Sequence, residues 1–248
     1  MPAIEARNLS KTYISGHFWN SKKAVALTKI NLSIERKQVF GLLGLNGAGK
    51  TTFMKIMLGL VFPTEGEAFV LGEKAGNIQT RKKTSYLPEM PYFPRYLTPL
   101  EILDFYGKLY EVPAPERKKR VKNALEKVGL LEKSNTKLKE FSKGMLQKVG
   151  IAQLLINNAE VFFLDEPTYG LDPLATKQMR DIILSLKKSG KTIFLSSHQI
   201  NEVKQICDKI GILYNGTLIT ETEVTKIKGS LEDYFVKRVV NERKKAAE

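Results

Sequence analysis

The stretch from Gly44 to Thr52, GLNGAGKTT, constrains the fold of this chain more than any other segment. It matches the phosphate-binding loop pattern G-x-x-x-x-G-K-[ST] at every fixed position. An apolar run from Val39 to Leu43 precedes the loop, and apolar residues at helical spacing follow it. The sequence therefore predicts a loop between a buried strand and a helix that begins near Lys50, which is the setting that this motif requires.

The residues of this loop predict a nucleotide-phosphate site. Its three glycines can adopt backbone angles that are closed to other residues, so that consecutive N–H groups turn toward phosphate oxygens, and the helix dipole adds to the attraction. We expect Lys50 to reach the β- and γ-phosphates, Thr51 to hold Mg²⁺ and Thr52 to close the α-phosphate side. The loop residues assigned to nucleotide binding are Gly44, Leu45, Asn46, Gly47, Ala48, Gly49, Lys50, Thr51 and Thr52.

A second group of candidate residues follows two predicted buried strands. The apolar run from Val161 ends in Asp165 and Glu166, and His198 comes just after the strand predicted at Thr192 to Ser196. Ligands of open parallel sheets bind at the carboxyl edge, and two adjacent acids at the end of a buried strand need a positive partner. We expect Asp165 to hold Mg²⁺, Glu166 to orient or deprotonate the attacking water, and His198 to contact the γ-phosphate. The alternative is that both acids only cap the following turn.

The rest of the chain predicts an α/β protein. Short strands at Ala3 to Leu9, Thr12 to Ile14 and Ala24 to Ile34 indicate an antiparallel side sheet before the loop, and Asn215-Gly216 indicates a hairpin near the C-terminus. Tyr13 either packs in this sheet or stacks on an adenine ring, and the sequence leaves the role of the tip His17-Phe18-Trp19 open. A helix is predicted at Pro99 to Tyr110, where Thr98 and Glu101 form a capping box. Further helices are predicted at Glu116 to Val128, after Pro113 and Pro115, and at Pro173 to Lys188, and a long apolar helix is predicted to end at Leu155.

Bulk properties bound the cellular setting. The formal net charge is +14, and the basic residues that produce it are scattered along the chain. This distribution favours a lysine-rich solvated surface over a binding site for nucleic acid or an anionic membrane. No run approaches 18 apolar residues, the N-terminus lacks a hydrophobic signal region, and Cys207 is the single cysteine. We therefore expect a cytosolic protein without a disulfide.

In combination, these motifs resemble the nucleotide-binding subunit of an ATP-binding-cassette (ABC) transporter over about Ile4 to Thr220. The segment Phe141 to Met145 falls at the family's signature, and Tyr169 to Asp172 falls at the loop that crosses to a partner subunit. The resemblance places Tyr13 at the adenine and Glu89 at a position that is usually glutamine, near nucleotide and metal. It implies that Ser142 and Gly144 contact a nucleotide bound by a second copy of the chain, or by a paralogous subunit.

The resemblance also implies the architecture and the partners. It predicts a phosphate-loop NTPase (RecA-like) core with a mostly parallel sheet, an antiparallel side sheet and an inserted helical subdomain at about 88–158. The ATP-binding domain would cover 1–220, and a short helical extension would cover 221–248. ATP and Mg²⁺ are the implied cofactors. The implied partners are the second subunit of a head-to-tail dimer and a membrane permease on the cytoplasmic face of the membrane, with no nucleic acid.

Several positions depart from the usual family pattern. Glu89 replaces glutamine, Lys143 and Met145 alter the signature, Tyr169 replaces a frequent serine, and Lys37 replaces a glycine. Such variants look like the ABC-2 branch, which is often linked to export of drugs, peptides or polysaccharides. We expect Lys143 either to attract the γ-phosphate or to face solvent.

Two alternatives remain at this point. A soluble ABC-type ATPase acting on ribosomes or nucleic acid would suit the positive charge, but the chain shows no internal repeat and no sustained heptads. A phosphate-loop kinase or GTPase would lack a use for the signature segment, and no N-K-x-D guanine-reading tetrad is present.

Overall fold

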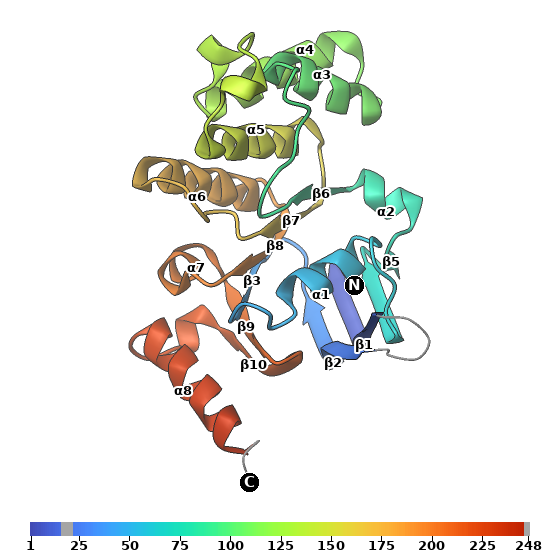
Figure 1. The fold of residues 1–248 in the computed structure, drawn as a ribbon, viewed down its shortest axis with the longest axis vertical. Helices are drawn as coiled ribbons and strands as arrows, with labels where there is room; N and C mark the ends of the chain where they lie inside the picture. The colour runs from blue at the N-terminus through green and yellow to red at the C-terminus, as the bar shows by residue number, and fades with distance from the viewer. Residues whose placement is uncertain (16–21, 246–248) are drawn as a thin grey trace.

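A six-stranded central sheet and a four-stranded side sheet form the frame of the molecule (Figure 1). The structure is a computed structural model, and it describes residues 1–15 and 22–245. The tip His17-Phe18-Trp19 lies outside the described residues. The central sheet has the order β10-β9-β3-β8-β7-β6. Its strands are β10 (Thr217–Glu223), β9 (Lys209–Tyr214), β3 (Val39–Gly44), β8 (Thr192–Ser197), β7 (Val161–Asp165) and β6 (Thr84–Leu87).

All pairs in the central sheet are parallel except β9 with β10, so the predicted mostly parallel α/β fold is confirmed. Because β3, β8, β7 and β6 are parallel neighbours, their carboxyl ends meet at one edge. Each of these four ends carries one group of predicted site residues. The phosphate loop follows β3, His198 follows β8, the acid pair is at the end of β7, and Glu89 follows β6. β10, which follows the predicted hairpin at Asn215-Gly216, pairs with β9 as far as Glu223, opposite Lys209.

The side sheet is antiparallel, with the order β2-β1-β4-β5. Its strands are β1 (Ile4–Ser15), β2 (Lys22–Ile34), β4 (Glu65–Val70) and β5 (Glu73–Lys74). The two short strands predicted at the N-terminus are one strand, β1. Register shifts on either side of Leu9, with Asn8 at a φ of 48°, form an irregularity that β1 passes through without ending.

Three helices that pack on one another form a group at one end of the molecule, and the last helix lies at the opposite end (Figure 1). The group contains α3 (Pro99–Leu109), α4 (Ala114–Lys127) and α5 (Lys143–Ile156), and the last helix is α8 (Leu231–Lys245). The others are α1 (Lys50–Met57), α2 (Ile78–Lys82), α6 (Pro173–Lys188) and α7 (Ile200–Ile206), with 3₁₀ turns at Leu131–Lys133, Leu138–Glu140 and Val224–Lys226. The division of the chain at residues 88, 158 and 220 stays a prediction.

Helix ends follow the local sequence signals. The predicted capping box is present, since Thr98 accepts a hydrogen bond from Glu101 N–H and Glu101 accepts one from Thr98 N–H. α4 begins at Ala114, two residues before the predicted start at Glu116. Pro115 therefore lies in the first turn of α4, where its missing N–H costs no helical hydrogen bond.

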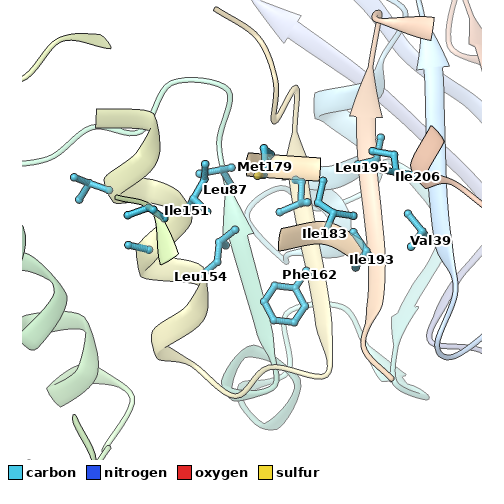
Figure 2. Close-up of a cluster of buried hydrophobic side chains, with 14 of the residues drawn as sticks. Val39, Leu87, Ile151, Leu154, Phe162, Met179, Ile183, Ile193, Leu195 and Ile206 are labelled. Atoms are coloured by element: carbon cyan, nitrogen blue, oxygen red, sulfur yellow. The ribbon is translucent and has the colours of Figure 1, made fainter. Parts of the chain in front are cut away.

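The central strands are buried on both faces, and this explains their uninterrupted apolar runs. In β3, β7 and β8 the side chains alternate between two clusters. One cluster, shown in Figure 2, includes Phe162 of β7 and Ile193 of β8 and extends to α5 and α6. The other packs α1 and the side sheet on the opposite face and centres on four stacked or tilted rings: Phe40, Phe53, Phe163 and Phe194.

Candidate active site

The loop between β3 and α1 encloses a cavity of about 370 Å³. Gly47 and Gly49 have φ angles of 79° and 107°, as the loop pattern predicts. Gly44 differs, because its φ is not positive. A Cβ there would stand 2.6 Å from the carbonyl oxygen of Leu213, so glycine is needed for close packing. The cavity is lined by Leu45, Asn46, Gly47, Ala48, Gly49, Lys50, Thr51 and Thr52, together with Ala26, Glu89 and Glu166.

The ammonium of Lys50 is held at the base of this cavity. Lys50 is only 7% exposed. Its Nζ donates to the carbonyl oxygen of Gly44 at 2.7 Å and lies 3.3 Å from Glu166 Oε1. A buried ammonium donates strong charge-assisted hydrogen bonds to phosphate oxygens, which would compete with the Glu166 carboxylate for it.

Thr51 and Asp165 bring two hard oxygen ligands together. Thr51 Oγ1 donates to Asp165 Oδ2 at 2.9 Å, and Ser196 Oγ donates to the other oxygen of Asp165. Mg²⁺ usually takes one or two carboxylates, substrate phosphates and water, so it does not need a cluster of acidic and histidine residues. No cluster of three such residues occurs in the described part of the chain. The residues present therefore fit Mg²⁺ bound together with a nucleotide.

Glu166 occupies a constrained position after β7. It has a φ of 47°, which is uncommon outside glycine, and its N–H donates to both Ser196 Oγ and Ser196 O. Its Oε2 accepts from His198 N–H at 3.1 Å and lies 2.9 Å from His198 Nδ1. The two acids contact Lys50, Thr51, Ser196 and His198, so their carboxylates are engaged within the site and not in capping the next turn.

The carboxylates of Asp165 and Glu89 lie near Tyr86, where β6 and β7 end. Burial of Tyr86, together with the nearby carboxylates of Asp165 and Glu89, raises the pKa of the Tyr86 hydroxyl to about 12. Glu89 lines the phosphate cavity, and its role toward the nucleotide or metal stays a prediction. An electronegative rim beside the Lys50 ammonium is an arrangement that a divalent cation can balance.

Six of the predicted site residues do not line the phosphate cavity: Tyr13, Gly44, Ser142, Gly144, Asp165 and His198. Tyr13 is on β1, with Lys11 Nζ 5.1 Å from its ring centroid. Ser142 is the N-cap of α5 and accepts from Met145 N–H at 3.3 Å, with Gly144 in the first turn of that helix. His198 contacts Glu166 rather than lining the cavity. The roles of Tyr13, Ser142, Gly144 and His198 toward a nucleotide stay predictions.

The structure also adds residues that sequence reasoning missed. Ser196 links Asp165 to the Glu166 backbone, and the parallel register places it directly beside Asp165. A signal for it was available, because Ser196 and Ser197 are polar residues at the end of an apolar strand. Ala26 of β2 had no such signal, since only the packing of the side sheet brings it to the cavity.

The parallel sheet, the loop and the acid pair at its carboxyl edge define a phosphate-loop nucleoside triphosphatase. Residues 27–169 match the family model described as ABC transporter, and the chain belongs to this family. It is an ATP-binding, ATP-hydrolysing member, as the resemblance implied. The kinase and GTPase alternative is thereby excluded.

Known relatives support this assignment. An uncharacterized ABC transporter ATP-binding protein of Synechocystis sp. is 46% identical over 94% of this chain, which spans 66% of that relative's length. The lantibiotic transport ATP-binding protein SrtF of Streptococcus pyogenes is 35% identical over 98% of this chain and all of its own length. A solved dimeric ATP-binding cassette, in a post-hydrolysis state bound to ADP and Pi, matches with a TM-score of 0.81 and 26% identity, covering 91% of this chain and 99% of that one.

Proposed function

We propose that this chain hydrolyses ATP between two head-to-tail copies, or between one copy and a paralogous subunit, and that closure and opening of the pair drive a membrane permease. The separation of the site into two parts supports this proposal. Ser142 and the N-terminus of α5 are not part of the lining of the phosphate cavity. A helix N-terminus favours anions, so α5 of one copy can complete the site of the other.

The contacts around the cavity support a role for several of the predicted residues. Lys50 binds the β- and γ-phosphates, and Thr51 and Asp165 would hold Mg²⁺, with Glu89 nearby. When bound, Mg²⁺ neutralises charge that develops on the phosphoryl group. Glu166 orients the attacking water or accepts its proton. His198 holds the Glu166 carboxylate through its N–H and Nδ1 and would contact the γ-phosphate.

The helical region offers a surface for the permease. Directly after Glu89, a cavity of about 450 Å³ is lined by Met90, Pro91, Tyr92, Arg95, Lys143, Leu146 and Gln147. Met90 and Tyr92 are 66% and 87% exposed, and Gln147 Nε2 is buried without a hydrogen-bond partner in the described part of the chain. We propose that a cytoplasmic segment of the permease packs its apolar side chains here and accepts a hydrogen bond from Gln147.

The proposed setting is the cytoplasmic face of a membrane, and the proposed cargo is a peptide or drug that is exported. None of the helices in the described ranges is long and apolar enough to cross a membrane. The similarity to SrtF, a lantibiotic transport ATP-binding protein, favours a peptide cargo. The second candidate, an ATPase acting on ribosomes or nucleic acid, finds support only in the net charge of +14.

The contact of Glu166 with both Lys50 and His198 carries the proposal, and Glu166→Gln tests it. The variant keeps the shape of the side chain but loses the base, so we expect ATP hydrolysis to fall at least about 100-fold while ATP binding remains. Phosphate release and light scattering with Mg²⁺-ATP measure turnover and dimer formation. The variant should accumulate as a dimer.

Glu160→Gln is the matched control, because Glu160 precedes the same strand at its other end and pairs on the surface with Arg36 and Lys83. It should keep wild-type turnover. Undiminished hydrolysis by Glu166→Gln would remove Glu166 from its role. Recovery of tagged protein with ribosomes, and not with a multi-span membrane protein, would favour the second candidate.

A further inference from the structure

We propose that Tyr169 is a positioning residue for Glu166, that it acts through His198, and that Lys143 holds it in place. The proposal rests on the proposed function, because it concerns the residue that handles the attacking water. Tyr169 and Lys143 are both departures from the usual family pattern. The structure brings these two side chains together, although 25 residues separate them in the 143–169 segment of the chain.

The first contact is between the two rings. The centroids of Tyr169 and His198 lie 5.6 Å apart at an interplanar angle of 63°, an edge-to-face arrangement within the favourable range. The Tyr169 N–H also donates to the carbonyl oxygen of Glu166 at 3.0 Å. Tyr169 is thus tied to the backbone of Glu166 by its own backbone, and to the Glu166 side chain through the His198 ring.

The second contact explains why the position of the His198 ring matters. His198 is 39% exposed at its side chain, so burial alone does not fix its rotamer. Its ring contacts the Glu166 carboxylate through Nδ1 at 2.9 Å and Tyr169 on another side. Loss of the Tyr169 ring leaves the imidazole free to rotate away from Glu166, which would then be less often aligned with the attacking water.

The third contact fixes Tyr169, which is itself 39% exposed. Lys143 Nζ lies 4.8 Å from the centroid of the Tyr169 ring, within the range of a cation–π interaction. Lys143 is the first residue of α5, directly after the N-cap Ser142. The chain of contacts therefore runs from the start of α5, through Tyr169 and His198, to Glu166, so that a shift of α5 alters the orientation of the catalytic carboxylate.

Steady-state ATP hydrolysis separates this role from binding. We expect Tyr169→Ala to lower kcat about fivefold to tenfold with the KM for ATP changed less than about twofold, and Tyr169→Phe, which keeps the ring, to restore wild-type kcat. Lys143→Met should lower kcat about twofold to fivefold, the size of an exposed cation–π interaction. Arg238→Met is the matched control, since Arg238 lies over the Tyr234 ring in α8, 5.1 Å away, and it should have no effect.

Histidine NMR tests the contact independently of turnover. The chain has only two histidines, so a His17→Gln background leaves one imidazole signal, that of His198. Tyr169→Ala should shift this signal through loss of the ring, and Tyr169→Phe should not. An inactive wild-type protein would refute the proposed function. An unchanged His198 signal or an unchanged kcat in Tyr169→Ala would overturn the positioning role, and so would a loss of kcat in Arg238→Met equal to that in Lys143→Met.

Discussion

At the scale of single residues, two lysines on one helix illustrate how position decides function. Lys50 and Lys55 are both on α1, yet Lys50 is buried in the phosphate cavity and Lys55 is exposed. In place of water, the Lys50 ammonium contacts the Gly44 carbonyl oxygen and the Glu166 carboxylate. The sequence motif distinguishes the two lysines, and the structure shows the physical difference between them.

We predict that Lys50→Met weakens ATP binding about 10-fold to 100-fold. A hydrogen bond to a charged group contributes about 1.5–3 kcal/mol, and methionine keeps the apolar stem of the side chain without its charge. Isothermal titration calorimetry with Mg²⁺-ATP measures the change, and Lys55→Met serves as the control on the same helix. Wild-type affinity in Lys50→Met would contradict the assignment of this loop.

At the scale of elements, aromatic packing ties α1 to the central sheet. The ring centroid of Phe194, on β8, lies 5.4 to 5.9 Å from the ring centroids of Phe53, Phe40 and Phe163. Phe53 is on α1, directly after the phosphate loop, so this cluster also sets the position of the loop relative to β7 and β8. The strands were predictable from their apolar runs. Which ring meets which was not predictable, because that depends on the order of the strands in the sheet.

We predict that Phe194→Ala lowers the free energy of unfolding by about 3–5 kcal/mol, since it removes a fully buried ring from a close-packed cluster. Phe194→Leu should lose less, because it keeps more of the buried volume. Urea denaturation followed by circular dichroism measures the difference. Phe62→Ala is the control, as Phe62 is 82% exposed. Equal losses in Phe194→Ala and Phe62→Ala would show that the cluster does not stabilise the fold.

At the scale of the whole molecule, the proposed site is shared between two copies. Ser142 and the N-terminus of α5 are not part of the lining of the phosphate cavity, and under the proposed function each of these two parts is completed by a second copy. Ser142 belongs to the part at α5. Its removal should therefore affect association of the copies and not nucleotide binding by one of them.

We predict that Ser142→Ala, in the Glu166→Gln background, weakens ATP-dependent dimer formation by about 100-fold or more and leaves the ATP affinity of the monomer unchanged. The lost hydroxyl would remove one hydrogen bond to a charged phosphate oxygen in each of the two sites. Analytical ultracentrifugation measures dimerisation. Thr98→Ala removes another N-cap hydroxyl, that of α3, and should cost about 1 kcal/mol of stability without weakening the dimer. Weakened monomer binding with intact dimerisation in Ser142→Ala would refute the shared site.

Local sequence patterns were enough to predict the phosphate loop, the acid pair at the end of β7, the capped start of α3 and the α/β class. Each of these depends on residues that are neighbours in the chain, where backbone conformation, apolar periodicity and capping act over a few positions. The folded structure was needed to find the contacts of Ser196, Ala26, Tyr169 and Lys143. These contacts join strands and helices that are distant in sequence. The parallel register and the packing of the elements bring the four residues within reach of Asp165, the phosphate cavity and His198, and no local pattern encodes either of these.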